Sequence, residues 1–205
     1  MSFKIVDFSK EELKCHDLSA RKCFNDCKQG YYLNKKDEKV DISSDIYRCL
    51  EGTKFYSADY DYEVQPLENE ERGLIEIRNE STMKGAYRMS VIEGKKNVCA
   101  LNFANAFTPG GGVLYGSRAQ EESLCRSCAL YYSLIQENPS QFYDFHNQNS
   151  EQFGAAATNS LIFTPNCPAW KVDEKLLDQP FLTSFISAAA IDNSFHEKTR
   201  DEARV

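Results

Sequence analysis

The sequence predicts a single mixed α/β domain with an N-terminal extension, and three observations support this fold class. The chain has 205 residues, of which 41% are hydrophobic, enough to bury one substantial core. Segments with strand-like and helix-like hydrophobic spacing follow one another along most of its length. Three glycines, Gly110-Gly111-Gly112, separate a strand-like segment from a helix-like one, an order typical of ligand-binding α/β domains. We place the extension at residues 1–72 and the core at residues 73–205.

The extension is predicted to begin with a helix that packs on the core. Ser9-Lys10-Glu11-Glu12 has the form of a capping box, and Gly30 is a typical helix stop. Between them, apolar side chains occur at helical spacing: Leu13, Leu18, Cys23, Phe24 and Cys27. Residues 31–72 then predict strands and loops, with short β-like runs at residues 39–43 and 54–57.

The core is predicted to begin with a β-α-β unit. Residues 73–79 alternate between apolar and polar side chains, as a half-exposed strand does, and a helix from Ser81 to about Ile92 follows them. The apolar, β-branched residues 97–103 predict a second strand, buried in the sheet. A right-handed crossover would make these two strands parallel.

The rest of the core is expected to alternate helices and strands. One helix is predicted over residues 119–134, and a shorter one begins at Pro139. A strand over residues 160–165 should stop at Pro165, and another covers residues 182–190. Residues 196–205 are predicted to begin a further, charged helix.

Composition excludes several classes of protein. The net charge of −7, from 31 acidic and 24 basic residues without a dense basic cluster, argues against direct binding of nucleic acid. No apolar run approaches the roughly 20 residues that span a bilayer, and the first residues lack the apolar stretch of a signal peptide. We therefore expect a cytoplasmic or nuclear protein that does not contact a membrane.

The eight cysteines are too sparse for a disulfide scaffold, so we expect free thiols. Cys125 and Cys128 have the spacing of a redox motif, but their place inside a predicted helix favours packing. A cysteine nucleophile activated by His146 is an alternative that this location makes less favourable. The histidines are scattered and the cysteines form no paired knuckles, so no metal site is predicted.

The most informative segment combines the three glycines with Gln120-Glu121-Glu122, seven residues later. Glycines let the main chain adopt positive φ and bring its N–H groups close to an anion. A phosphate-sized cradle beside paired carboxylates could hold a nucleotide and cleave a glycosidic bond. Taken separately, the glycines could form a surface turn, and the glutamates could be solvated residues of a first helical turn.

The pattern Gly-Gly-Gly, seven residues, Gln-Glu-Glu resembles the signature of poly(ADP-ribose) glycohydrolases, which are macrodomain-fold enzymes. The similarity extends over residues 99–130, and Pro109 before the glycines resembles the microbial-type branch. Weaker similarity occurs at residues 29–32, 79–82 and 184–189. The resemblance implies a three-layer α/β/α macrodomain-like fold with a mixed sheet. It also implies hydrolysis of ribose–ribose O-glycosidic bonds in poly(ADP-ribose), with release of ADP-ribose and without a cofactor.

The resemblance assigns roles to individual residues. Glu122 matches the catalytic acid, Glu121 would hold the ribose hydroxyls next to the scissile bond, and Gln120 would shape the same ligand-binding loop. Gly110, Gly111 and Gly112 match the loop that contacts the diphosphate. Asn105 lies where the family places a polar group near the ribose. From the residues alone, Asn105 could equally be a turn residue whose side chain bonds its own backbone.

The chemistry needs a proton for the departing oxygen. The helix dipole favours ionised Glu122 by roughly 0.3–1 kcal/mol. The charge of Glu121, burial beneath the sugar and the diphosphate all act in the other direction and raise the pKa of Glu122 by more. We therefore expect Glu122 to be protonated in the substrate complex, to donate that proton, and then to take one from the attacking water.

The sequence departs from the family pattern in one respect. That pattern continues with a further strand and a second glycine-rich loop, which do not occur before Val205, so we expect a core truncated at its C-terminus. Two alternatives to an enzyme follow: a non-catalytic ADP-ribose-binding macrodomain, or an inactive fragment with an exposed sheet edge. As partners we expect poly(ADP-ribose) or ADP-ribosylated proteins, ADP-ribose as product, and a monomeric chain.

Overall fold

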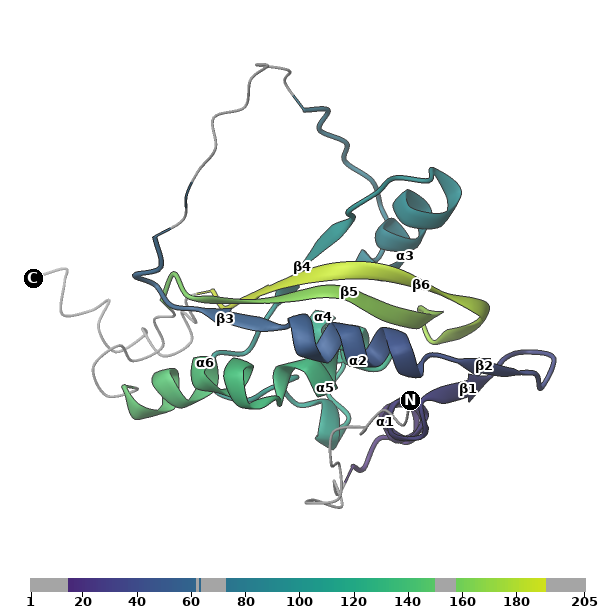
Figure 1. Ribbon diagram of the computed structural model, residues 1–205, viewed down its shortest axis with the longest axis horizontal. Helices are drawn as coiled ribbons and strands as arrows, with labels where there is room; N and C mark the ends of the chain where they lie inside the picture. The colour runs from purple at the N-terminus through teal and green to yellow at the C-terminus, as the bar shows by residue number, and fades with distance from the viewer. Residues whose placement is uncertain (1–14, 62, 64–72, 150–157, 191–205) are drawn as a thin grey trace, which may run out of the picture.

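In the computed structural model, which describes residues 15–61, 63, 73–149 and 158–190, a mixed four-stranded sheet forms the centre of the molecule (Figure 1). The strand order is β3-β5-β6-β4. These strands are β3 (Lys54–Tyr56), β4 (Cys99–Phe103), β5 (Leu161–Val172) and β6 (Lys175–Ala188). β4 runs parallel to β6, whereas β3 and β6 are antiparallel to β5. The expected α/β class with a mixed sheet is confirmed.

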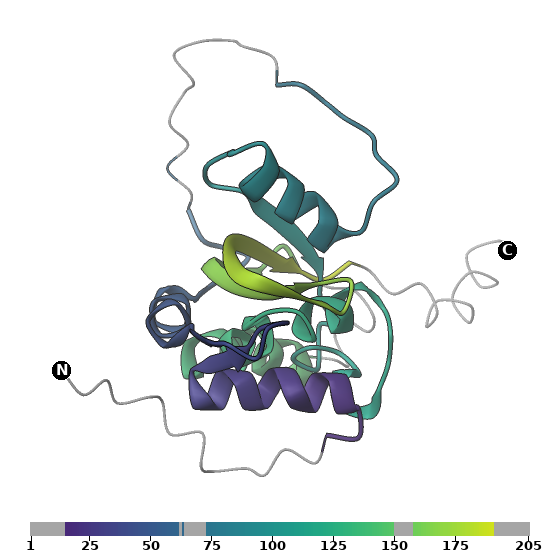
Figure 2. The same ribbon diagram turned by 90° about the vertical axis from the view of Figure 1, so that its right-hand side faces the viewer.

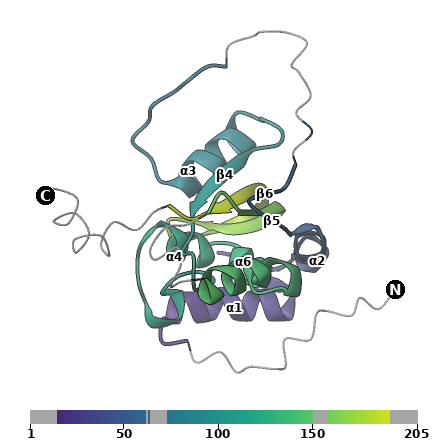
Figure 3. The ribbon, with the colours of Figure 1, turned by 90° about the vertical axis from the view of Figure 1, so that its left-hand side faces the viewer.

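Helices cover the sheet on both faces, which gives three layers (Figures 2 and 3). On one face lie α1 (Leu18–Gln29), α2 (Ser43–Gly52), α4 (Gln120–Cys125), α5 (Leu130–Leu134) and α6 (Glu137–Gln148). On the other face lies α3 (Thr82–Tyr87), which continues as the π-helical turn η2 (Arg88–Ile92). The fully buried side chains include Trp170, Phe185, Ile162, Leu130 and Phe142. They place the main core between the sheet and the larger helical layer.

Helix α1 begins and ends at local signals. Asp17 is its N-cap and accepts the main-chain N–H of Ala20 at 2.8 Å. Gly30 ends it in the left-handed conformation, as predicted. The Ser9 capping box lies outside the described residues, but residues 15–17 are not helical, so the prediction of one helix from Ser9 to Gly30 is wrong. Leu18 is 76% exposed and does not belong to the buried face of α1. The Trp170 indole donates to the Asp26 carboxylate at 3.1 Å, which ties α1 to β5.

After α1, the structure corrects the prediction of strands and loops alone. β1 (Tyr31–Leu33) and β2 (Lys39–Asp41) form a small antiparallel sheet, and β3 agrees with the expected strand. Residues 43–52, however, form helix α2. Its buried residues Ile46, Cys49 and Leu50 are three and four positions apart, so they occupy one helical face. That spacing was present in the sequence and was missed.

Residues 73–79 do not form the expected strand. Leu74, Ile75 and Ile77 are 87%, 88% and 98% exposed, and no described strand pairs with this segment. The predicted parallel β-α-β unit is therefore wrong, because β4 finds its parallel partner in β6. The helix that follows is confirmed as α3 and η2, and the Ser81 hydroxyl accepts the Lys84 N–H at 3.2 Å as its N-cap.

Strand β5 continues past Pro165, where the sequence predicted its end. A register shift lies between Thr164 and Cys167, so Pro165 falls in a bulge and is not required to donate to the ladder. Inside this bulge, Asn166 has φ of 44° and donates its N–H to the Ser184 hydroxyl at 3.1 Å. β5 and β6 then form one long hairpin, so helices and strands do not alternate to the end of the described chain.

Two further expectations need correction. The predicted helix over residues 119–134 is divided into α4 and α5, because Ala129 donates its N–H to the Pro168 carbonyl of β5 at 3.2 Å. β4 is not buried on both faces, since Leu101 and Phe103 are 48% and 64% exposed. The shorter helix predicted at Pro139 is confirmed as α6.

The cysteines are free, as expected, and all except Cys99 are buried. Cys125 ends α4 and Cys128 lies between α4 and α5, so their interpretation as packing residues is confirmed. The His146 ring contacts the Phe142 carbonyl and Thr158 and is not bonded to a cysteine. No helix among the described residues could cross a membrane. The helix predicted at residues 196–205 lies outside those residues.

Candidate active site

The three glycines lie in the loop between β4 and α4, and each meets a different steric demand. Gly110 and Gly111 have φ of 69° and 56°, as predicted for this loop, whereas Gly112 has φ of −91°. A Cβ on Gly111 would lie 2.5 Å from Glu122 Oε1, and one on Gly112 would lie 2.2 Å from the Ser117 hydroxyl. The glycines therefore let the main chain approach the carboxylates closely.

The expected cradle of free N–H groups is not what the structure shows. The Gly111 N–H donates to the Thr108 carbonyl at 3.0 Å, and the Gly112 N–H donates to Glu122 Oε1 at 2.9 Å. The N–H groups of Gly111 and Gly112 thus bond within the loop and to Glu122. Contact between the glycines and a diphosphate stays a prediction. A diphosphate would lie against the main chain, which glycines leave uncovered because they have no side chain.

Glu122 lies in the first turn of α4 and is 6% exposed. Its Oε1 accepts the Gly112 N–H, which fixes the carboxyl against the glycine loop. Its Oε2 is buried and has no hydrogen-bond partner among the described residues. A buried polar atom without a partner is uncommon in a folded protein and calls for an explanation. This oxygen therefore has a hydrogen-bonding capacity that the described residues do not use.

Glu121 is 3% exposed and is held at both oxygens. Oε2 accepts the main-chain N–H of Asn105 at 2.8 Å, and Oε1 accepts the side-chain amide of Asn102 at 3.2 Å. Burial raises the pKa of Glu121 to about 7, against these hydrogen bonds, which lower it. Among the described residues, no lysine or arginine forms an ion pair with either glutamate. The Glu121 carboxyl therefore changes its protonation near neutral pH.

Gln120 fastens α4 to β4. Its Oε1 accepts the Phe103 N–H at 2.9 Å, and its Nε2 donates to the Leu101 carbonyl at 2.7 Å. The same Nε2 lies 3.2 Å from the Thr82 hydroxyl. The amide thus bonds two main-chain groups of β4 that point away from β6, as a neighbouring strand would. This geometry places the two glutamates that follow Gln120 beneath the glycine loop.

Asn105 acts here as a turn residue. Its Oδ1 accepts the N–H groups of Phe107 and Thr108, each at 2.8 Å, and so stabilises the start of the glycine loop. Its own N–H is the donor to Glu121. This is the alternative that the sequence left open, and direct contact between Asn105 and a ribose stays a prediction.

Two polar residues of the site were not predicted. Asn102 of β4 and Ser187 of β6 are both buried, and the Asn102 amide donates to the Ser187 hydroxyl at 3.0 Å. For Asn102 the signal was available, because it is the polar side chain of an otherwise apolar strand, whereas β6 also contains Thr183 and Ser184 close to Ser187. A buried polar residue in such a strand needs a partner, which here is Glu121 together with the opposite strand.

A cavity of about 310 Å³ lies beside the start of α4. Gln120, Ser123 and Leu124 line it from one face of α4, whereas neither Glu121 nor Glu122 belongs to its lining. Besides Gln120, its polar lining comes from both helical layers and from the β5–β6 turn: Glu80, Ser81, Thr82, Arg118, Ser123 and Asp173. The cavity is therefore a polar space beside α4 that is separate from the two glutamates.

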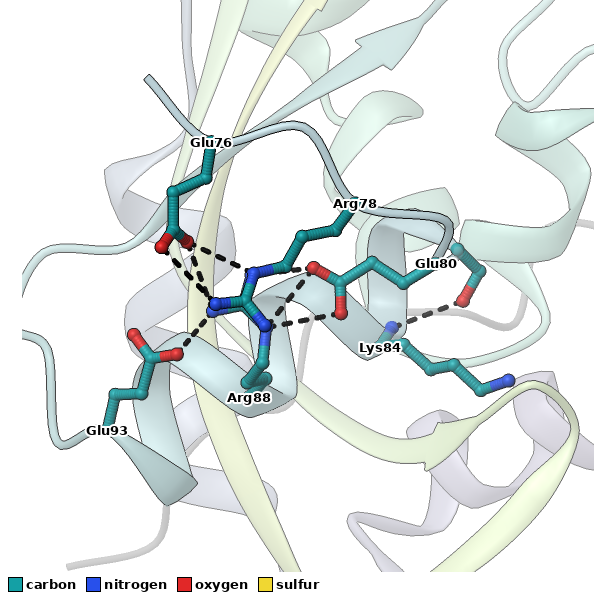
Figure 4. Close-up of polar contacts among 7 residues, drawn as sticks. Glu76, Arg78, Glu80, Lys84, Arg88 and Glu93 are labelled. Carbon is teal, nitrogen blue, oxygen red and sulfur yellow. Dashed lines mark hydrogen bonds and ion pairs between the residues drawn. The ribbon is translucent and has the colours of Figure 1, made fainter. Parts of the chain in front are cut away.

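A second group of carboxylates lies on the opposite helical layer, around Arg88 (Figure 4). Arg88 contacts Glu80 at 2.6 Å and also pairs with Glu93, while Glu76 accepts from Arg78 at 3.1 Å. The hydrogen bond from Arg88 lowers the pKa of Glu80, and the bond from Arg78 lowers that of Glu76. These carboxylates stay ionised, and they hold α3 and η2 to the segment that precedes them.

Comparison with known proteins agrees with this geometry. Residues 20–172 match the family model described as the catalytic domain of microbial-type PARG. The poly(ADP-ribose) glycohydrolase (PARG) of Thermomonospora curvata is similar in structure, with a TM-score of 0.79 and 29% identity over 89% of this chain and 66% of that chain. The same enzyme bound to the inhibitor ADP-HPD gives a TM-score of 0.75 at 29% identity, over 91% of this chain and 66% of that one.

The PARG of Deinococcus radiodurans in complex with ADP-ribose is also similar, with a TM-score of 0.62 and 29% identity over 77% of this chain and 62% of that chain. Comparison with curated protein sequences gives no significant match. The chain spans about two thirds of the length of the Thermomonospora curvata enzyme. The family model covers most of the chain, including the glycine loop and both glutamates, so the chain belongs to the family of microbial-type PARG catalytic domains.

Proposed function

We propose that this chain hydrolyses the ribose–ribose O-glycosidic bond of poly(ADP-ribose) and releases ADP-ribose. The observation that carries the proposal is the buried Glu122 carboxyl, fixed through Oε1 to the Gly112 N–H while Oε2 has no partner among the described residues. A held carboxyl with one unused oxygen is suited to deliver a proton to a bound ligand. Family membership and the solved PARG structures with ADP-ribose support the choice of substrate.

In this proposal, Glu122 Oε2 carries the proton in the substrate complex. The bond between the anomeric carbon and the departing ribose oxygen breaks as Glu122 gives its proton to that oxygen. A water then attacks the anomeric carbon and returns a proton to Glu122, so the enzyme ends as it began. Glu121 has a pKa raised to about 7, so it would accept a hydrogen bond from a ribose hydroxyl when ionised and donate one when protonated.

Binding would use the glycine loop that lies against the glutamates. The glycine loop presents main chain without side chains, which lets a diphosphate come close to Glu122. Poly(ADP-ribose) and ADP-ribosylated proteins are therefore the partners that we propose.

The test is to incubate the purified chain with labelled poly(ADP-ribose) and to measure both free ADP-ribose and the thermal stability of the protein. Release of ADP-ribose that disappears in Glu122→Gln supports the proposal. Stabilisation by ADP-ribose without release would contradict the enzyme and support a binding module. If ADP-ribose is not released and does not stabilise the protein either, both functions are contradicted for this chain.

A further inference from the structure

Asn102 has an arrangement that the proposed reaction does not use. It is fully buried in β4, and its register partner across the parallel pair is Ser187 of β6. Its Nδ2 donates both to Glu121 Oε1 at 3.2 Å and to the Ser187 hydroxyl at 3.0 Å. Its Oδ1 is buried without a partner among the described residues. The amide nitrogen of Asn102 thus donates two hydrogen bonds, whereas its oxygen accepts none from the described residues.

Asn102 Oδ1 could accept a hydrogen bond from Glu121 once the Glu121 carboxyl is protonated. Ionised Glu121 needs a donor, which Asn102 Nδ2 supplies, whereas a neutral carboxyl needs an acceptor for its O–H. Half a turn of the Asn102 amide would bring Oδ1 to the place that Nδ2 now occupies. Ser187 can follow this exchange, because a hydroxyl accepts from Nδ2 in one state and donates to Oδ1 in the other.

We propose that Asn102 and Ser187 are a positioning pair that holds the Glu121 carboxyl in one place in both of its protonation states by turning over the Asn102 amide. The pair would act on the reaction only through Glu121, so its effect on turnover rests on the proposed function. Its effect on the position of the Glu121 carboxyl is independent of that function. The amide and hydroxyl suit this task because each can donate and accept, which a lysine or an arginine could not do.

The surroundings of Glu121 support two populated states. Its pKa, raised to about 7 by burial, places the proton exchange near neutral pH. The titratable groups that face it are Glu122 and Cys125 of α4 and Tyr143 of α6. Burial holds the pKa of Cys125 and Tyr143 well above their usual values, so both stay protonated there. The remaining coupled acid is Glu122, which Glu122→Gln removes for the test.

The direct test follows the side-chain amide signals of Asn102 by ¹H–¹⁵N NMR as the pH is raised from about 5 to about 9. We expect these signals to move with a midpoint near that of Glu121, to keep moving in Glu122→Gln, and to stop moving in Glu121→Gln. Asn34 is the matched reference, since it is also buried and donates to a glutamate, Glu38, at 2.9 Å, far from the site. Static Asn102 signals in a sample where Glu121 titrates would overturn the proposal.

A second test measures turnover. Asn102→Leu removes both halves of the amide and should lower kcat about 10- to 100-fold, as expected for a misplaced active-site group, with a smaller change in ADP-ribose affinity. Ser187→Ala is the milder variant if Asn102→Leu fails to fold, and Ser187→Thr, which keeps the hydroxyl, should lie closer to the parent chain. If all three variants have the kcat and the pH profile of the parent chain, the proposed role of the pair is contradicted. If the parent releases no ADP-ribose, the proposed function fails, and the amide signals still test the pair.

Discussion

Two groups of carboxylates, on opposite layers of the same sheet, show how surroundings decide what a glutamate can do. Glu121 and Glu122 are buried under the glycine loop, and no described lysine or arginine pairs with them. Glu76, Glu80 and Glu93 surround Arg88 at the surface (Figure 4). Burial raises the pKa of Glu121, whereas cations lower the pKa of Glu76 and Glu80. Glu121 can therefore exchange a proton near neutral pH, whereas Glu76 and Glu80 stay ionised there and form ion pairs.

The largest expected effect separates the two groups by chemistry. Glu122→Gln should lower hydrolysis of poly(ADP-ribose) by about 10²- to 10⁴-fold, because an amide cannot supply the proton that the departing oxygen needs. ADP-ribose binding, measured by calorimetry, should change much less. Glu76→Gln is the matched control, since it neutralises a glutamate of the other group that does not line the cavity beside Gln120, and it should leave hydrolysis near the parent value. Undiminished hydrolysis in Glu122→Gln would refute the assigned role.

The next effect tests why the buried group needs the glycines. Gly111→Ala would place a Cβ 2.5 Å from Glu122 Oε1 at a φ of 56°, so the loop must move or the carboxyl must leave its place. We expect a loss of roughly 1–3 kcal/mol in folding free energy from the strained main chain, together with loss of ADP-ribose binding. Gly73→Ala, where an added Cβ meets nothing within 4 Å, should change neither. Unaltered binding in Gly111→Ala would show that the close approach is not required.

The two groups should also respond to pH with opposite sign. The pKa of Glu121 rises from its ordinary 4.5 to about 7 on folding, so its stabilising contribution is complete below pH 4.5 and is lost as the pH rises to about 7. Glu121→Gln removes this dependence and should raise the free energy of unfolding near pH 8 by up to about 3 kcal/mol, with little change near pH 4. Denaturant unfolding at both pH values measures it, and a variant that is less stable than the parent near pH 8 would contradict the raised pKa.

The smallest effect is expected at the exposed group. The pKa of Glu80 is lowered by Arg88, so the stability that this pair contributes is present above the ordinary value of 4.5 and is lost as the pH falls through the lowered pKa. Glu80→Gln should therefore remove a small stabilisation near neutral pH, and added salt should reduce the difference between parent and variant, because both side chains of the pair are in part accessible to solvent. A salt-independent loss as large as that in Gly111→Ala would show that the two groups do not differ in this way.

Sequence reasoning succeeded where the signals were local. Gly30 ends α1 and Ser81 begins α3 because caps act within a few residues. The expectation that the glycines and Glu122 lie together is confirmed, because one loop and one helical turn bring Gly112 and Glu122 into contact. In each case the contacts that matter are close in sequence.

It failed where the contact is distant. The alternation at residues 73–79 is strand-like, but a strand also needs a neighbour, and none of the described strands pairs there. Pro165 did not end β5, because a bulge opposite β6 accommodates it. Asn102 meets Ser187 only through the register between β4 and β6, so no pattern within one segment could pair them.

The most direct test of the contrast between the two groups is a ¹³C NMR titration of the glutamate carboxyl carbons in the ligand-free chain, with signals assigned by Glu121→Gln and Glu80→Gln. We predict that the Glu121 carboxyl titrates near pH 7 and that the Glu80 carboxyl titrates below 4.5. Titration of both carboxyls in the range of ordinary exposed glutamates would contradict the account, since Glu121 would then have no proton to exchange near neutral pH.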